Sequence, residues 1–167
     1  MLTYKGIQFR LYPDAKQQKQ IAETFGCCRY VYNHFRASWE NTYIETGKGL
    51  SYKACANELP LLKVDFPFLK DVDSTALQKS VRSLADAYQR FYAKLGKYPR
   101  FKSKRNPVQS YTTAIQGNTQ VFTTTVTNNR IRLPKLGWLK IRGSRTIQGR
   151  IVSARSLAKR AVVISYR

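Results

Sequence analysis

The carboxylates of this 167-residue chain are few and lie in its first half. The sequence holds nine Asp and Glu residues, and the last of them is Asp86. Metal-dependent nucleases hold their ions through clustered carboxylates, and no two acids here form such a motif. Asp71 and Asp73 precede Ser74 at the start of a helical pattern, where carboxylates stabilise a helix N-terminus. The sequence therefore predicts no catalytic carboxylate cluster.

Basic side chains dominate the second half. Lys and Arg number 30, the net charge is +21, and 18 of these cations lie in residues 87–167. They alternate with aromatic residues, and a surface of one sign repels itself unless a polyanion binds to it. This half shows no basic amphipathic helix of the kind that binds membrane surfaces. We therefore predict a nucleic-acid partner and no membrane partner.

A basic loop at residues 97–107 concentrates this chemistry. Its cations alternate with Tyr98 and Phe101, so we expect the cations to contact phosphates and the rings to stack or pack. For Phe101 we favour packing, as a core anchor of the loop. The cations expected to contact the phosphates of RNA are Arg100, Lys102, Lys104 and Arg105.

The cysteines and the single histidine are weak candidates for a metal site. Cys27, Cys28, Cys55 and His34 match no zinc-ligand spacing, and Cys28 lies on an apolar stripe. We therefore expect no metal and no cofactor. An odd number of irregularly spaced cysteines argues against a disulfide framework, and residues 1–10 do not resemble a signal peptide. The cysteine pattern and the N-terminal residues both favour a cytoplasmic location.

Hydrophobic spacing predicts two long helices. Apolar residues recur at spacings of 4, 3, 4, 3, 4 from Ile21 to Trp39 and again from Leu77 to Leu95. Each set therefore lies on one stripe of a helix, and two such stripes are expected to pack together as a small bundle. The expected helices cover residues 14–46, 51–62 and 74–95.

On either side of these helices the period changes to two. Residues 2–11 alternate as a strand, and several short segments rich in Thr, Val, Ile and Tyr follow the basic loop. Closely spaced short strands favour a small β-barrel, so the fold class is α+β, with a helical bundle inserted after the first strand of an OB-like barrel. The later strands are expected at 108–115, 119–127, 130–133, 138–142, 146–156 and 159–166. The domains are then 1–12 (first strand), 13–96 (helical insert) and 97–167 (basic loop and remaining strands).

Six long motifs spread over nearly the whole chain carry a family resemblance. They are FRLYP (9–13), TFGCCRYVYNHF (24–35), GKGLSY (47–52), DSTALQKSV (73–81), YPRFKSKRNPVQSYT (98–112) and LPKLGWLKIR (133–142). Together they resemble the N-terminal part of TnpB proteins, the OrfB family of transposon-encoded RNA-guided nucleases. The resemblance implies a wedge β-barrel with a helical recognition insert, followed by an RuvC-like nuclease domain with a zinc-binding insertion.

The chain departs from this family in one large respect. It ends at Arg167, about where the nuclease domain with its three metal-binding acids and zinc cysteines should begin. We therefore expect it to bind guide RNA and a short double-stranded DNA motif without cutting, associated with the nucleoid when DNA-bound. Two alternatives stay open: an autonomous transposon-derived DNA-binding repressor, and the non-catalytic subunit of a split nuclease whose catalytic domain is a separate chain.

The resemblance implies a set of residues that face the duplex motif. Ser74 opens a helix, where an N-terminus suits phosphate contact. Gln78 offers the donor and acceptor that suit adenine in the major groove, whereas Lys79 and Arg82 suit the backbone. The full set is Tyr52, Ser74, Thr75, Gln78, Lys79, Arg82, Thr112, Thr113 and Gln116.

A second set resembles the wedge segment that holds the guide RNA. Lys140 and Arg142 alternate with apolar residues and so share the polar face of a strand. For Trp138 we favour a core position over a stacking platform. The full set is Lys135, Trp138, Lys140, Arg142 and Arg145, extended by Arg150, Arg155, Lys159 and Arg160.

Overall fold

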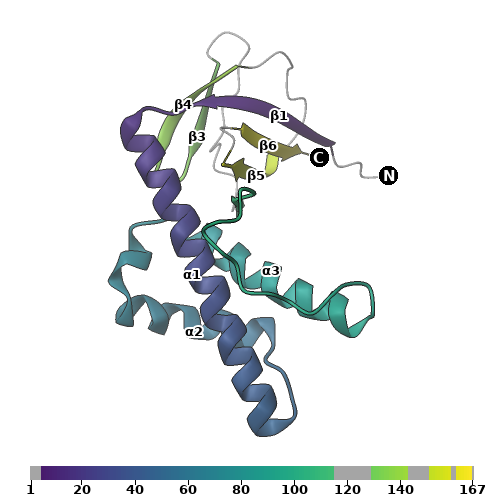
Figure 1. The fold of residues 1–167 in the computed structure, drawn as a ribbon. Helices are drawn as coiled ribbons and strands as arrows, with labels where there is room; N and C mark the ends of the chain where they lie inside the picture. The colour runs from purple at the N-terminus through teal and green to yellow at the C-terminus, as the bar shows by residue number, and fades with distance from the viewer. Residues whose placement is uncertain (1–4, 115–128, 143–150, 159–160, 167) are drawn as a thin grey trace. The chain divides into compact units, whose positions relative to one another are not determined.

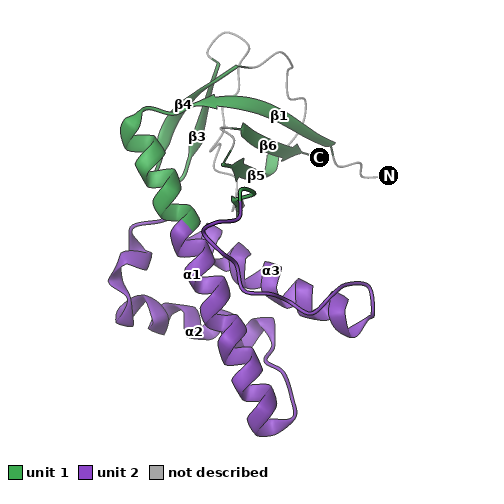
Figure 2. Ribbon diagram, in the orientation of Figure 1, with its two compact units in different colours: residues 1–25, 107–167 green, residues 26–106 purple. Residues whose placement is uncertain are grey.

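The computed structural model describes residues 5–114, 129–142, 151–158 and 161–166 (Figure 1). The chain divides into two compact units: residues 1–25 and 107–167 form unit 1, and residues 26–106 form unit 2 (Figure 2). Helix α1 (Ala15–Thr46) contributes its first turns to unit 1 and the rest to unit 2. No helix in the described ranges is long and apolar enough to cross a lipid bilayer. Outside the described residues lie the expected strand at 119–127 and the candidates Gln116, Arg145, Arg150, Lys159 and Arg160.

Unit 1 is built on a six-stranded antiparallel sheet. The strands are β1 (Lys5–Tyr12), β2 (Ser110–Ala114), β3 (Arg130–Leu133), β4 (Gly137–Arg142), β5 (Ile151–Leu157) and β6 (Ala161–Tyr166). Their order is β2-β5-β6-β1-β4-β3, so the N-terminal strand pairs with β6 on one side and β4 on the other. The sheet curls into half a barrel (Figure 1). The predicted α+β fold, with helices inserted after the first strand, is confirmed.

Strand alternation gives this sheet an apolar inner face and a polar outer face. In β1, Phe9 and Leu11 are buried, whereas Arg10 and Tyr12 are exposed. Strands β3 and β4 alternate in the same way. The inner core consists of Phe9, Leu11, Ile131, Leu133, Leu136, Leu139, Ile141, Ala154, Val162 and Ile164. The outer face of β1, β4 and β3 is therefore formed by polar and aromatic side chains.

A reciprocal capping pair begins α1. Asp14 Oδ1 accepts from the backbone N–H of Gln17 at 2.8 Å, and Gln17 Oε1 accepts from the N–H of Asp14 at 3.1 Å, which satisfies two otherwise unpaired donors. The amide nitrogen of Gln17 also donates to the carbonyls of Leu136 and Trp138 at 3.2 and 3.0 Å. Gln17 thereby fixes the turn from which β4 begins.

Unit 2 is helical. Besides most of α1 it contains α2 (Tyr52–Asp65), the short 3₁₀ helix η1 (Pro67–Lys70) and α3 (Ser74–Tyr92), followed by the basic loop. The side chains of Ser51 and Asp73 cap α2 and α3. Helix α1 packs on α3 where Trp39 stacks on Tyr88, with ring centroids 4.4 Å apart. The predicted packing of the two apolar stripes is confirmed by this contact.

Helix α3 ends earlier than its spacing predicts. Lys94 adopts a left-handed φ of 59°, which cannot continue a right-handed helix. The N–H groups of Lys94 and Leu95 donate to the carbonyls of Phe91 and Arg90, the pairing of a Schellman motif. Leu95, predicted on the buried stripe, is therefore 73% exposed, and that part of the prediction was wrong.

Candidate nucleic-acid interface

The outer face of unit 1 carries cations that lie opposite one another across the strands. Arg10 of β1 pairs in register with Arg142 of β4, and Arg130 of β3 pairs with Lys140 of β4. Strands β1, β3 and β4 contain no acidic residue. Like charges directly opposite in an antiparallel pair are destabilising, so this arrangement favours a bound polyanion. We call these exposed residues the cation ladder: Arg10, Arg130, Arg132, Lys140 and Arg142.

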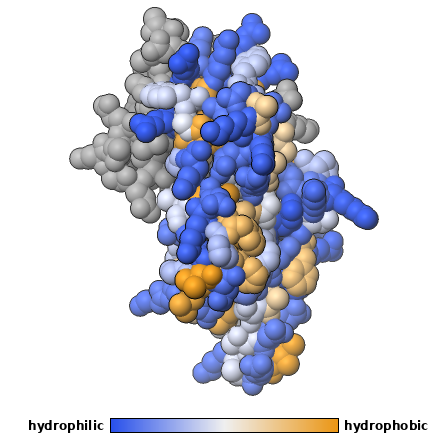
Figure 3. All heavy atoms as spheres, turned by 90° about the vertical axis from the view of Figure 1, so that its left-hand side faces the viewer, coloured by the Kyte–Doolittle hydropathy of each residue, from blue (hydrophilic) through white to orange (hydrophobic). Residues whose placement is uncertain are grey.

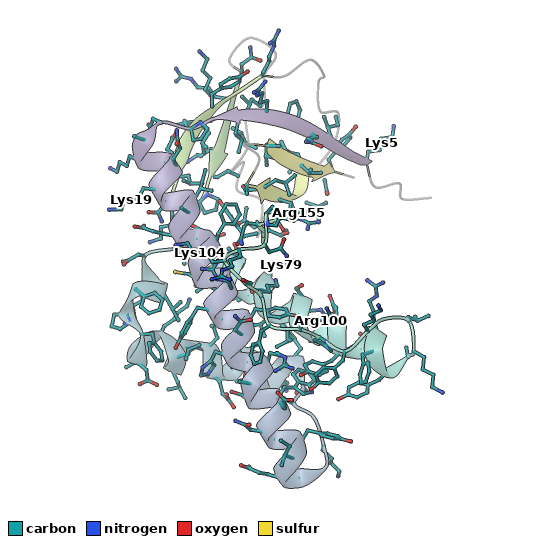
Figure 4. All side chains as sticks on the ribbon, viewed as in Figure 1. Lys5, Lys19, Lys79, Arg100, Lys104 and Arg155 are labelled. Carbon is teal, nitrogen blue, oxygen red and sulfur yellow. The ribbon has the colours of Figure 1, made fainter. Side chains whose placement is uncertain are left out.

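Aromatic residues interrupt the ladder on the same face. Trp138 lies opposite Arg132, and Tyr12 lies opposite Lys140. Trp138 is 47% exposed, so the core position favoured for it was wrong: strand alternation places it on the same face as Lys140. The prediction that Lys140 and Arg142 share a polar face is confirmed. Nitrogen-tipped side chains gather around these strands in Figure 4.

The remaining candidates of unit 1 are less uniform. Lys135 is exposed in the turn before β4, with a φ of 63°. Thr113 of β2 is only 1% exposed, so direct contact with DNA is not open to it. Thr112 is half-buried and lies opposite Arg155 of β5, whose guanidinium donates to Ser110 Oγ at 3.0 Å (Figure 4).

The N-terminus of α3 in unit 2 is already satisfied by a carboxylate. Asp73 accepts from the N–H groups of Thr75 and Ala76 at 3.1 and 3.2 Å. This confirms Asp73 as a capping residue and removes the free amides that we expected to contact phosphate. Lys63 donates from Nζ to Ser74 Oγ. Burial lowers the pKa of Lys63, and the nearby Asp73 charge opposes that shift.

The exposed face of α3 contains the predicted polar residues. Gln78, Lys79 and Arg82 are all exposed, and Lys79 is labelled in Figure 4. Arg82 Nε lies 3.2 Å from Asp86 Oδ1, and its guanidinium lies 5.0 Å from the ring centroid of Tyr52. The structure therefore brings Tyr52 and Arg82 together, one helical turn beyond Gln78.

The basic loop is fixed to α1 by two residues that sequence reasoning missed. The side chain of Asn33 pairs with both backbone groups of Lys102, donating to its carbonyl at 2.9 Å and accepting from its N–H at 2.8 Å. Arg36 is 8% exposed and donates to the Pro99 carbonyl at 3.1 Å and to Glu40 at 2.7 Å. The spacing of Arg36 and Glu40, four residues apart, was the available signal.

Arg36 also organises the aromatic residues of the loop. Its guanidinium carbon lies 3.8 Å from the ring centroid of Phe101 and 5.5 Å from that of Tyr98. Phe101 is 55% exposed, so the prediction of a core anchor was wrong: the ring packs on the buried guanidinium of Arg36 while the rest of the residue faces solvent. The side chains of Arg100, Lys102, Lys104 and Arg105 are exposed, with Arg100 and Lys104 labelled in Figure 4.

The cysteines of unit 2 are buried side chains of its core. Burial raises the pKa of Cys28 to about 12 and that of Cys55 to about 11, so both thiols stay protonated at neutral pH. Within the described parts of the chain, no group of three His, Cys, Asp or Glu side chains could hold a metal ion.

Comparison with known proteins agrees with the family resemblance of the sequence motifs. Residues 1–48 match the helix-turn-helix domain family HTH_OrfB_IS605. The chain is 31% identical over 152 residues to InsQ of Escherichia coli K12, named as a candidate RNA-guided DNA endonuclease, across 89% of this chain and 36% of InsQ. It is 33% identical over 103 residues to a Streptomyces pristinaespiralis protein of the same description, across 60% of this chain and 26% of that protein. The chain thus spans about a third or less of the length of these relatives.

These matches support a nucleic-acid-binding role. The family describes residues 1–48 as a helix-turn-helix domain, and the structure shows which elements this segment forms. The described part of residues 1–48 forms strand β1 and the single helix α1. This segment contributes Arg10 of β1 to the cation ladder, whereas the other ladder cations, α3 and the basic loop lie outside it.

Proposed function

We propose, from the homology of this chain to the TnpB-like proteins of the OrfB family, that it is the nucleic-acid-binding part of an RNA-guided DNA endonuclease. The cation ladder of unit 1 and the basic loop of unit 2 bind the guide RNA, and α3 of unit 2 contacts a short duplex motif. In such systems base pairing supplies most sequence specificity, while the protein reads shape and a short motif.

The cross-strand register of the cation ladder carries this proposal. Arg10 opposite Arg142 and Arg130 opposite Lys140 place like charges side by side, an arrangement that weakens the free sheet. A phosphate backbone relieves this repulsion and releases its own counterions when it binds. The exposed Trp138 and Tyr12 add aromatic surface between the cations, as expected for RNA with unstacked bases.

The same chain is proposed to bind without cutting. No carboxylate side chain follows Asp86, so the acid-free region that forms most of unit 1 offers no carboxylate ligand to a catalytic metal ion. Purified protein incubated with guide RNA, a matched plasmid and magnesium should leave the plasmid intact. Cutting that persists through repurification would contradict this part of the proposal.

The test of RNA binding is its salt dependence. The affinity for a structured RNA should fall steeply with salt, by about 0.7 to 0.9 in logarithmic slope for each phosphate neutralised. The double variant Lys140→Ala/Arg142→Ala should lower that slope by about one to two. The matched control Lys16→Ala/Lys19→Ala removes the same charge from α1 of unit 1, outside the ladder, and should change the slope less.

An unchanged slope in the ladder variant would show that these cations are merely solvated. The same measurement on duplex DNA tests the alternative that the chain is a DNA-binding repressor. Tight, sequence-specific binding to duplex DNA in the absence of RNA would favour a repressor over an RNA-guided role.

A further inference from the structure

A cavity of about 310 Å³ opens on the outer face of unit 1. Its lining consists of Tyr12, Asn129, Lys140, Ile141 and Arg142. The volume falls at the lower end of the range for small-ligand sites, about 300 to 1,000 Å³. An aromatic ring, a primary amide and two cations therefore meet around one space at the edge of the cation ladder.

The aromatic wall of this cavity is exposed and flanked by cations. Tyr12 is 44% exposed at the end of β1 and lies opposite Lys140. The guanidinium carbon of Arg10 lies 6.0 Å from the ring centroid of Tyr12, at the limit of a cation–π contact. An accessible ring beside basic groups is the arrangement on which nucleobases stack in single-stranded nucleic acid sites.

The amide at the cavity is held on a strained backbone. Asn129 has a left-handed φ of 37°, a conformation that costs free energy in a residue with a side chain, although Asn tolerates it better than most. Its carbonyl accepts from the N–H of Ile141 at 2.7 Å, which fixes the residue against β4. Its exposed side chain offers a donor and an acceptor, the pair needed to bind the edge of a base.

We propose that this cavity binds a single unpaired nucleotide of the RNA, with the base stacked on Tyr12, the base edge bonded by Asn129 and the phosphate neutralised by Lys140 and Arg142. The inference rests on the proposed function, since it specifies which part of the RNA the ladder receives. A paired base hides its faces and its Watson–Crick edge in the helix, whereas an extruded base exposes both. Unit 1 therefore distinguishes extruded nucleotides from paired ones.

The experiment compares two RNA hairpins with the same stem and loop, one fully paired and one with a single extruded 2-aminopurine nucleotide. The intact chain should bind the extruded hairpin at least about fivefold more tightly, since stacking of one base on one ring has an effect of this size. Its 2-aminopurine fluorescence should change on binding. Tyr12→Ala should abolish both the preference and the fluorescence change, and Tyr12→Phe should keep them.

Two further variants separate stacking from edge contact and from loss of fold. Asn129→Gly allows the same backbone conformation and should reduce the preference without abolishing it. Tyr43→Ala removes a tyrosine of similar exposure from α1 in unit 2 and should leave the preference intact. Binding of the fully paired hairpin by Tyr12→Ala, with an unchanged salt slope, shows that the ladder is still folded.

The outcomes distinguish this inference from the proposed function. Equal binding of both hairpins by the intact chain overturns the cavity proposal and leaves the RNA-binding proposal in place. A preference that survives Tyr12→Ala also overturns it. Absence of salt-dependent binding to either hairpin overturns both.

Discussion

The two units contain the same number of cations and use them differently. Each has 15 Lys and Arg residues, but unit 1 has two acids and unit 2 has seven. In unit 2, Arg36 pairs with Glu40 and Arg82 pairs with Asp86. In unit 1, four of the five ladder cations lie opposite another cation, Arg10 opposite Arg142 and Arg130 opposite Lys140. On the face shown in Figure 3, the described residues of unit 1 are mainly hydrophilic, whereas apolar patches interrupt the surface of unit 2.

This difference shows that charge has opposite structural consequences in the two units. In unit 2, Arg36 and Arg82 pair with acids of the same unit, and Arg36 also positions the basic loop, so the removal of either should lower stability. Under the proposed function, the ladder cations weaken the free sheet that bears them and stabilise only its complex with RNA. Their removal should lower binding and raise the stability of the free protein.

The largest expected effect is the loss of Arg36. In Arg36→Ala the Pro99 carbonyl and Glu40 each lose a partner, and removing one member of a buried ion pair destabilises strongly. We expect the free energy of unfolding to fall by about 3 kcal/mol, which is the lower end of the range for breaking a buried ion pair, because Glu40 is partly exposed. Denaturant unfolding measures the loss, and hydrogen exchange should rise in residues 97–106. Arg90→Ala, an exposed arginine of the same unit, is the control; an equal loss in both would contradict the anchoring role.

The next effect is the alkaline sensitivity of unit 2, which contains all three cysteines. Burial raises the pKa of Cys28 from 9.0 to about 12 and that of Cys55 from 9.0 to about 11. Above pH 9 the unfolded chain loses these protons before the folded one, so stability falls as pH rises towards 11. Unfolding free energies at pH 8 and pH 10 should differ by about 2.5 kcal/mol.

The control for this pH dependence removes the thiols. Cys28→Ala/Cys55→Ala should be less stable at pH 8, because it leaves a cavity, yet should lose less stability between pH 8 and pH 10. An equal loss in both proteins would assign the pH dependence to other groups.

A smaller effect concerns the proposed reading of DNA by α3. Gln78→Ala should relax the preference at one base pair of the motif by about tenfold, since a bidentate base contact has an effect of this order. The neighbouring Lys79→Ala should weaken all duplexes alike, because a phosphate contact carries no sequence information. Binding of a set of duplexes varied at each position, with guide RNA present, measures both. Unchanged ratios in Gln78→Ala would show that Gln78 reads no base.

Much of the fold could be predicted because its signals are local. The 4, 3, 4, 3, 4 spacing defines α1 and most of α3, and strand alternation defines the faces of β1 and β4. The end of α3 was not predicted, because the left-handed residue that ends the helix is Lys94, where a glycine would be usual. The spacing of Leu95 continued the stripe beyond the residue where the helix stops.

The candidate interface was less predictable because it depends on register. The alternation of Arg10 and Tyr12 with apolar residues is visible in the sequence, but their pairing with Arg142 and Lys140 joins segments about 130 residues apart. The exposure of Trp138 follows from strand alternation within β4, which places it on the face of Lys140, so this one feature was open to prediction from the sequence. Asn33 and Arg36 were missed because they act through backbone groups of a distant loop, which no side-chain pattern records.

The smallest effect is the most direct test of the comparison, because one kind of substitution should have opposite signs in the two units. Arg142→Gln removes a charge opposite Arg10 and should stabilise the free protein by about 0.5 kcal/mol at low salt. Arg82→Gln breaks the pair with Asp86 and should destabilise by a similar amount. Both changes should vanish near 1 M salt, where charges are screened within about 3 Å.

With RNA bound, Arg142→Gln should become destabilising, since the complex loses a phosphate contact. A destabilised free Arg142→Gln protein would show that the ladder stabilises the sheet by itself, and the proposed role of the ligand in relieving its repulsion would fail.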